Sequence, residues 1–248
     1  MSNPIEIIPL TGFPIVKNEN QLWTSLKQVL SGQIKDGDVL VCAHTPFSRV
    51  MGYSFALEDF TPSEQAKTIA AIVSKDPRKI EAILQHSKEI VKIGRNVVIA
   101  ENHAGVVCAN SGIDESNAGL GRLVAVPENP DELANQIRTF VLNELGVKIA
   151  VIISDTVGRA LRRHAVNIAI GSAGIDPVKN YVGKKDLFGY ELKVSKIALA
   201  DEIASAAELV QGQSDEGIPF VIVRNVQFET STVGARELNR PSNERLFS

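Results

Sequence analysis

Two segments of the sequence place an aspartate beside glycines directly after an apolar run. The first is ANSGIDESNAGLGR (109–122), which carries Asp114 and Asn117, and the second is VIISDTVGRALRRH (151–164), in which an apolar strand is expected to end at Asp155. Carboxylate oxygens are hard ligands that suit Mg²⁺ or Mn²⁺ better than zinc. The four histidines show no H-x-H or HExxH spacing, so no zinc site is indicated. Taken alone, each aspartate would also suit a polar turn or a helix cap.

Basic residues follow the second aspartate. Arg159, Arg162 and Arg163 belong to the same segment, and Lys184 follows in GKKDLF. Guanidinium groups bind phosphates and carboxylates through paired hydrogen bonds. A solvated run of charge is the plain alternative, but the neighbouring aspartates favour an anionic substrate.

A nucleotide would need a binding loop other than the common ones, because neither GxxxxGK[ST] nor GxGxxG occurs. The segment QGQSDEGIP (211–219) is a candidate, since its glycines let backbone amides approach phosphates while Gln213 and Asp215 offer polar contacts. An ordinary helix-to-strand loop is the alternative. No G-x-S-x-G occurs either, so the residues themselves indicate a metal-dependent enzyme with phosphorylated or carboxylated substrates, without naming the reaction.

Composition sets outer limits on the class of protein. The chain has 248 residues, 44% of them hydrophobic and 22% charged, with a net charge of −3, which argues against a broad nucleic-acid-binding face. Its apolar runs are too short to span a bilayer, and the N-terminus lacks a secretory pattern, so a cytoplasmic location is expected. Cys42 and Cys108 lie in apolar runs and are predicted to be buried free thiols.

The elements that position these residues mix helices and strands without strict alternation, which predicts an α+β fold with mixed or antiparallel sheets. One helix is expected to start at Thr61-Pro62, and another at Asp76-Pro77 with Ile90 on its apolar face. Further helices are predicted at 21–32, 130–145 and 198–210. Strands are predicted at 38–43, 148–154, 167–171 and 218–226, and a hairpin at 96–100 and 105–109. No linker or repeat is evident, so residues 1–248 are expected to form one catalytic unit or two intimate subdomains.

Several motifs resemble the coenzyme F420-0:γ-glutamyl ligase family. They are VVCANSGIDESN, ISDTVGRALRRHAVNIAIG, GKKDLFGYEL, ADEIASAAELVQGQ and GARELNRPSNERLF, and the openings IEIIPLTGFPIV and LEDFTPSEQAK are similar too. The resemblance covers nearly the whole chain. It implies a GTP-dependent amide ligase that adds L-glutamate to the carboxylate of F420-0 through an acyl phosphate. It also implies two divalent cations (Mg²⁺ or Mn²⁺), K⁺, a homodimer and a non-Rossmann fold without an appended flavin-type domain.

The same resemblance assigns roles to individual residues. Asp114 and Asp155 match the family's first metal site, and Thr156 and Gln213 match its second. The residues that match nucleotide contacts are Thr11, Gly12, Phe13, Pro14, His44, Thr45, Asn117, Gln211, Gly212, Ser214, Asp215, Glu216, Gly217 and Ile218. The resemblance does not assign the basic residues described above. We predict from their charge that the phosphodiester of the acceptor or the incoming glutamate is bound by Arg159, Arg162, Arg163 and Lys184.

One stretch departs from the family pattern. The family usually has Ser-Thr, two apolar residues and Ser-Lys-x-Glu-Gly-Arg, whereas this chain reads AHTPFSRVMGY (43–53). Arg49 replaces the lysine and keeps its charge, Met51 replaces the glutamate, and Tyr53 removes an anion-binding arginine. Recognition of phosphate or acceptor is therefore expected to differ on this side. A ligase for another acceptor such as a folate, a metal-dependent phosphohydrolase, and a non-enzymatic nucleotide-binding protein stay open as alternatives.

Overall fold

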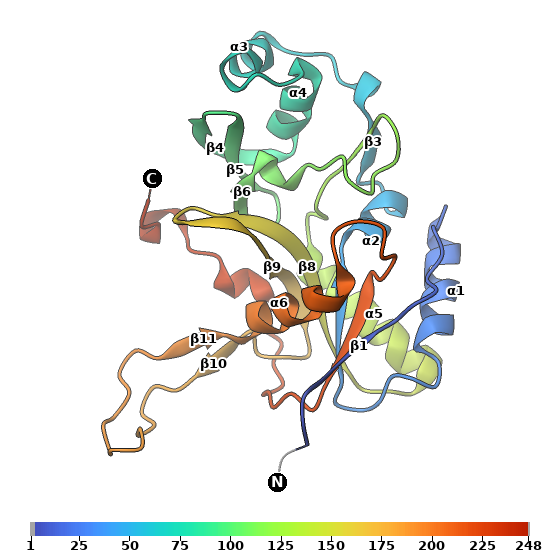
Figure 1. Cartoon of the computed structure of the whole chain (residues 1–248), viewed down its shortest axis with the longest axis vertical. Coiled ribbons are helices and arrows are strands. Elements are labelled where there is room, and N and C mark those ends of the chain that lie inside the picture. Colours follow the sequence, from blue (N-terminus) through green and yellow to red (C-terminus); the bar gives the residue numbers. More distant parts are fainter. Residues whose placement is uncertain (1–2, 248) are drawn as a thin grey trace.

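A computed structural model describes residues 3–247 of the chain. Its larger lobe is built on a five-stranded sheet, seen in the centre of Figure 1. In spatial order its strands are β1 (Glu6–Pro9), β12 (Phe220–Arg224), β2 (Val39–Ala43), β8 (Ala150–Arg159) and β9 (Arg162–Ala173). β2 and β8 are parallel, and the other neighbouring pairs are antiparallel. The α+β expectation of mixed sheets with packed helices is thereby confirmed.

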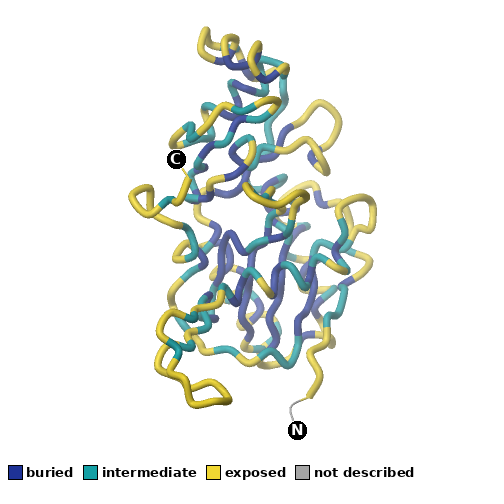
Figure 2. The backbone as a smooth tube through the Cα atoms, turned by 60° about the vertical axis from the view of Figure 1, so that its left-hand side comes forward, coloured by how far each residue is buried: buried dark blue, intermediate teal, exposed yellow. Residues whose placement is uncertain are grey.

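Helices cover both faces of this sheet. Successive side chains of a strand point to opposite faces, and Leu40 and Cys42 pack in one hydrophobic core with α1 and α5, while Val39 and Val41 pack in another with α6. These helices are α1 (Glu19–Leu30), α5 (Pro130–Leu145) and α6 (Leu199–Gln211). The central strands form the dark blue, buried part of the tube in Figure 2. Burial on both faces explains why they read as continuous apolar runs.

A smaller lobe lies at the top of Figure 1 and has its own hydrophobic core. It contains α3 (Glu64–Val73), α4 (Pro77–Gln85) and the sheet β4 (Ser87–Gly94), β5 (Val97–Asn102) and β6 (Val107–Ala109). The connection between the lobes includes α2 (Thr45–Val50) and the strand pair β3 (Ser54–Ala56) and β7 (Arg122–Val124). The C-terminal segment returns to this lobe, where Arg245 forms ion pairs with Glu89 and Glu101 of its sheet.

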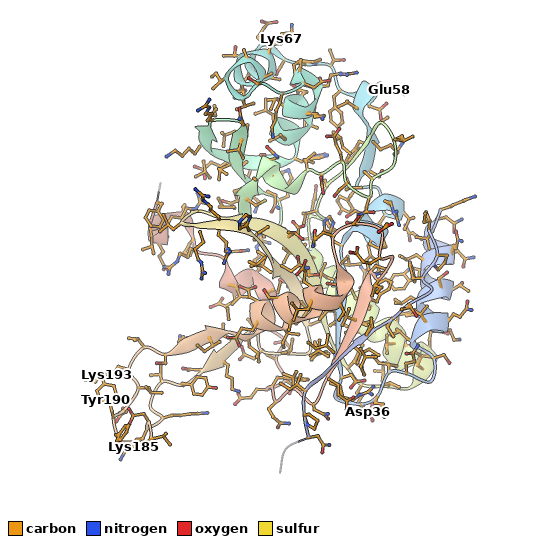
Figure 3. All side chains as sticks on the ribbon, viewed as in Figure 1. Asp36, Glu58, Lys67, Lys185, Tyr190 and Lys193 are labelled. Carbon is orange, nitrogen blue, oxygen red and sulfur yellow. The ribbon has the colours of Figure 1, made fainter. Side chains whose placement is uncertain are left out.

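An arm projects from the larger lobe. It consists of the antiparallel pair β10 (Val178–Asn180) and β11 (Lys196–Ala198) and the long loop between them. The loop is the exposed yellow projection in the lower part of Figure 2, and Figure 3 places Lys185, Tyr190 and Lys193 around its tip. No helix among residues 3–247 is long and apolar enough to cross a membrane.

Most helix boundaries and strand cores agree with the sequence-based predictions. Asp76 caps α4 by accepting a hydrogen bond from the backbone N–H of Arg78 at 2.8 Å, and Gly146 ends α5 with a positive φ of 71°. β5 and β6 form the predicted antiparallel pair. Cys42 and Cys108 are both buried, as expected.

Two local predictions in the smaller lobe are wrong. Helix α3 begins two residues later than predicted, because Ser63 and not Thr61 is its N-cap and accepts a hydrogen bond from Ala66 N–H at 3.2 Å. Ile90 lies opposite Ala100 in β4 and not on α4, since pairing with β5 keeps residues 87–94 extended. Apolar spacing alone did not reveal this strand, which is interrupted by β-bulges.

The prediction that a strand ends at Asp155 is also wrong. β8 continues to Arg159, because hydrogen bonding to β9 extends beyond the apolar run, with Asp155 opposite Ile168 and Thr156 opposite Asn167. Asp155 is therefore fixed inside a strand ladder rather than at a strand end.

Candidate active site

A cavity of about 580 Å³ opens where β2 and β8 leave the buried sheet. Because these strands are parallel and Ala43 lies beside Ser154, the next residues, His44 and Asp155, reach the same edge. The other walls come from segment 13–15, the turn between β6 and β7, and the loop after α6. The predicted site residues that line the cavity are Phe13, Pro14, His44, Thr45, Arg49, Asp114, Asn117, Asp155, Thr156, Gln211, Gly212, Gln213, Ser214, Asp215, Glu216, Gly217 and Ile218.

The side chain of Asp155 lies against His44, the residue that follows β2. Its Oδ1 lies 3.5 Å from Nε2 of His44, and Nδ1 of the same imidazole is hydrogen-bonded to the hydroxyl of Ser48 at 2.9 Å. His44 and Ser48 are both buried. Burial raises the pKa of the Cys108 thiol to about 12, and the negative charge of Asp155 contributes to that shift. Asp155 is therefore a largely buried carboxylate with a fixed orientation.

Thr156 joins β8 to the loop after α6. Its hydroxyl accepts a hydrogen bond from Gln213 Nε2 at 2.9 Å and donates one to Asn167 Oδ1 at 2.6 Å. Gln213 Nε2 also lies 3.2 Å from Glu208 Oε1. Sequence reasoning missed Asn167 and Glu208. Asn167 is a polar residue at a buried position of the run VNIAIG, which was the available signal, whereas Glu208 reads as an ordinary exposed helix residue.

Asp114 has the turn geometry that was the alternative to a ligand role. Its carboxylate accepts hydrogen bonds from the backbone N–H groups of Glu115 and Ser116 and from the Ser116 hydroxyl. Its backbone forms a bridge to Val124, which places the residue on the cavity wall. A carboxylate oxygen has several lone-pair sites, so these contacts leave Asp114 able to bind a cation as well.

Arg49 brings a positive charge into the cavity. Its guanidinium donates to the carbonyl of Asn117 at 3.3 Å, and Asn117 has a positive φ of 54°. Nε of Arg49 is buried and has no partner among residues 3–247, and burial lowers the pKa of this guanidinium. A buried donor without a partner points to an anion from solution.

In the loop after α6, a carboxylate of the loop itself is hydrogen-bonded to the loop backbone. The carboxylate of Glu216 accepts a hydrogen bond from Ser214 N–H at 2.8 Å and lies against Gly212, where an added Cβ would collide with it. Gly212 and Gly217 both have positive φ. Hydrogen bonds from the backbone N–H groups of Glu216 itself and of Ser214 lower the pKa of the Glu216 carboxyl. The loop therefore presents amide groups that can bind an oxyanion.

Comparison with known proteins identifies the family to which this chain belongs. The family model described as F420-0:Gamma-glutamyl ligase matches residues 12–225. The chain is 43% identical over 243 residues to the coenzyme F420:L-glutamate ligase of Methanocaldococcus jannaschii, which covers 98% of this chain and 96% of that protein. The chain belongs to the F420-0:γ-glutamyl ligase family. The relatives of the same name from Methanopyrus kandleri (45% over 199 residues; 80% of this chain, 79% of that protein) and Methanothermobacter thermautotrophicus (39% over 248; 98% of each) agree.

Six predicted site residues lie outside the cavity wall. Thr11 and Gly12 were assigned from the family resemblance, and the basic residues predicted to bind substrate are Arg159, Arg162, Arg163 and Lys184. The continuation of β8 beyond Thr156 carries the arginines to the tip of the β8–β9 hairpin. There the Arg159 guanidinium donates to the carbonyls of Arg163 and His164. Lys184 lies on the arm, 5.2 Å from the centre of the Tyr181 ring. The assignment of these four basic residues to substrate binding stays a prediction.

The oxygen ligands expected for γ-glutamyl ligase metals are consistent with a hard divalent cation. Asp114 and Asp155 supply carboxylates, Thr156 a hydroxyl and Gln213 an amide oxygen to the same cavity. In the described part of the chain, no three His, Cys, Asp or Glu side chains cluster closely enough to hold a metal by themselves. Mg²⁺ is commonly held by one or two carboxylates together with substrate phosphates, whereas zinc needs a fuller protein set. The donor set therefore fits Mg²⁺ or Mn²⁺.

Proposed function

We propose that this chain is a GTP-dependent ligase that joins L-glutamate to the carboxylate of F420-0. The name coenzyme F420:L-glutamate ligase, carried by relatives that are 39–45% identical, supports the acceptor and the amino acid. The observation that carries the proposal is the meeting of Asp155 and Thr156 with the loop 211–218 in one cavity. A phosphate-binding loop beside hard oxygen ligands is the arrangement that phosphoryl transfer requires.

The proposed reaction has two steps. A carboxylate oxygen of the acceptor attacks the γ-phosphorus of GTP, GDP leaves, and an acyl phosphate forms. The amine of glutamate then attacks the acyl carbon, phosphate leaves, the amine loses a proton, and an amide remains. Two Mg²⁺ or Mn²⁺ ions held by Asp114, Asp155, Thr156 and Gln213, together with K⁺, would neutralise charge on the phosphoryl oxygens.

Backbone and side-chain groups of this protein would bind and orient the nucleotide. The amides of the loop 211–218 would bind phosphate oxygens, and Arg49 would pair with a phosphate from the opposite wall, where its Nε has no partner among the residues described. Asn117, held by Arg49, would contact the nucleotide nearby. The backbone amide of Ser214 would become available to a phosphate oxygen once the Glu216 carboxylate, its partner in the structure, is displaced.

A different acceptor is the second candidate, and the substitutions between 49 and 53 favour it. Arg49 lines the large cavity, whereas Tyr53 lines a smaller one beside it, so both replacements lie next to candidate binding space. A change of residues at these walls is the expected route to a ligase for another carboxylate, such as a folate.

The homodimer and the cytoplasmic location also stay proposals. Leu187 and Phe188 at the tip of the arm are 99% and 96% exposed, which supports a protein partner. Light scattering tests the dimer: the mass of two chains is expected, and the 26.8 kDa of one chain would contradict it.

Mass spectrometry tests the reaction directly. F420-0 incubated with the protein, GTP, Mn²⁺ and L-glutamate is expected to gain the mass of added glutamate residues, with GDP formed in step. GTP hydrolysis that does not depend on glutamate would indicate a phosphohydrolase instead. GTP binding without turnover, with F420-0 and with folate, would indicate a non-enzymatic nucleotide-binding protein.

A further inference from the structure

A second cavity, of about 120 Å³, lies on the other side of the turn Asn110–Gly112 and is called the side pocket here. Asn102 and His86 lie in its wall, with Tyr53, His103 and Glu128 around them. Ser111 contacts the side pocket, whereas Asn110 and Gly112 line the active-site cavity. The two cavities therefore share this turn as a common wall.

The side pocket is lined by two residues that each carry a buried nitrogen atom without a partner among residues 3–247. The Oδ1 atom of Asn102 accepts a hydrogen bond from Val106 N–H at 3.0 Å, which fixes the amide so that Nδ2 is the atom left over. Asn102 is 3% exposed, and its Nδ2 has no partner among residues 3–247. Nε2 of His86 is likewise buried and, within the same residues, unpaired. Buried polar atoms are nearly always paired, so two such atoms in one small cavity indicate a missing ligand or water.

The chemistry of these atoms selects the ligand. An amide nitrogen can only donate, so it excludes a metal cation at that position and requires an oxygen acceptor. Burial and the nearby His103 lower the pKa of His86, against an opposing contribution from Glu128, and in the neutral tautomer with its proton on Nε2 this atom is an uncharged donor. A carboxylate has two acceptor oxygens and can therefore accept hydrogen bonds from both atoms. The volume of the side pocket suits a short carboxyalkyl group and excludes a nucleotide.

One glycine brings the side pocket next to Asp155. A Cβ added to Gly112 would lie 3.6 Å from Asn102 Nδ2 and 3.7 Å from Asp155 Oδ2, so both side chains lie close to the same point. It would also lie 2.8 Å from Val126 Cγ2, and Gly112 has a φ of +73°. Both the space and the backbone conformation therefore require glycine here.

We propose that the side pocket binds the side-chain carboxylate of the amino-acid substrate and directs its amine toward the Asp155 side of the shared wall. This inference rests on the proposed function, because it assigns a place to the amino acid of that reaction. Asn102 and His86 are the residues that recognise the carboxylate. Selection of glutamate over glutamine then follows, because hydrogen bonds to a charged carboxylate are stronger than hydrogen bonds to a neutral amide.

Asn102→Asp tests this assignment with little change of shape. The carboxylate keeps the acceptor for Val106 N–H but replaces the donor at Nδ2 by a negatively charged acceptor. We expect the KM for L-glutamate to rise at least about tenfold, while the Kd for GTP stays within about twofold, because a repelled carboxylate readily loses that much affinity. Asn180→Asp is the matched control, since Asn180 Oδ1 also accepts a backbone N–H, that of Val182 at 2.9 Å, but on the exposed arm.

Three outcomes would overturn the inference. An unchanged KM for glutamate in Asn102→Asp would mean that the pocket holds only ordered water, and a lower KM would mean that it binds an ammonium group. If the wild-type chain ligates no amino acid, that result rejects the proposed function but leaves the inference about the side pocket to a separate measurement. Calorimetric titration of L-glutamate then decides the inference: tighter binding to wild type than to Asn102→Asp supports it, and equal binding or none overturns it.

Discussion

Nε2 of His44 lies 3.5 Å from Oδ1 of Asp155, and the other nitrogen of the ring lies 2.9 Å from Ser48 Oγ. The family resemblance assigned His44 to phosphate contact, but its position also makes it a support for Asp155. Residues that orient a metal-binding carboxylate commonly change metal affinity or activity by tenfold or more when replaced. His44 and Ser48 are therefore positioning residues for the candidate metal site.

Ser48→Ala is expected to weaken this support. It leaves His44 Nδ1 buried without its partner, which costs about 1–3 kcal/mol of unfolding free energy, and raises the Mg²⁺ concentration for half-maximal activity about tenfold. Thermal denaturation and metal titration measure both effects. Ser172→Ala is the control, because Ser172 Oγ is buried and has no partner within residues 3–247. Equal effects of the two substitutions would contradict a role for Ser48.

Glu216→Gln is expected to tighten GTP binding severalfold. The Glu216 carboxylate accepts Ser214 N–H and lies over Gly212, so it uses the amides that a phosphate would need. Removing the negative charge of Glu216 makes it easier for a phosphate to displace this side chain from the loop amides. Asp215→Asn removes the same charge from the same loop and serves as the control in fluorescence titrations with a GTP analogue. Weaker binding by Glu216→Gln would show instead that this carboxylate contacts the bound nucleotide or its metal.

Arg49→Lys is expected to raise the KM for GTP about tenfold with kcat changed less, because a lysine supplies charge but cannot form paired hydrogen bonds. Arg49 Nε is the donor lost, and it has no partner among the described residues. Arg78→Lys is the control, since Arg78 pairs with Asp76 and lines neither the active-site cavity nor the side pocket. Steady-state kinetics with GTP varied would reject this role for Arg49 if both constants stayed at their wild-type values.

Gly112→Ala is expected to destabilise the chain more than Gly121→Ala. Both glycines have positive φ, 73° and 70°, so each alanine carries about 1–2 kcal/mol of backbone strain. Only at Gly112 does the added Cβ meet Val126, which adds about 1–3 kcal/mol of overpacking, whereas nothing lies within 4 Å at Gly121. Urea denaturation of the two variants measures the difference. Equal losses of stability would show that the shared wall is not tightly packed.

The sequence predicted those parts of the fold and of the site whose signals are local. The apolar run before His44, the cap at Asp76 and the stop at Gly146 each depend on neighbours in sequence, and the loop 211–218 was visible from its glycines. The arginines after Asp155 illustrate what was not local. Whether they flank the cavity or leave it depends on β9, whose hydrogen bonds extend β8 to Arg159.

The side pocket could not have been predicted for the same reason. Asn102 ends β5 and His86 follows α4, and only the folded chain brings the two residues to one pocket. In the sequence, Asn102 is part of the turn ENH, where asparagine is ordinary. Its unused Nδ2 becomes informative once burial and the hydrogen bond to Val106 are known.

Asp155→Asn tests the central claim, that Asp155 binds a divalent cation at the nucleotide phosphates. The substitution preserves size and removes one negative charge from a carboxylate held within β8. The decisive measurement is the melting temperature with GTP, with and without Mn²⁺, alongside turnover. We predict that Mn²⁺ stabilises the wild type and the arm variant Asp186→Asn but not Asp155→Asn, which folds normally and loses turnover by about a hundredfold or more. Near-normal turnover in Asp155→Asn, with its stabilisation by Mn²⁺ intact, would contradict the account.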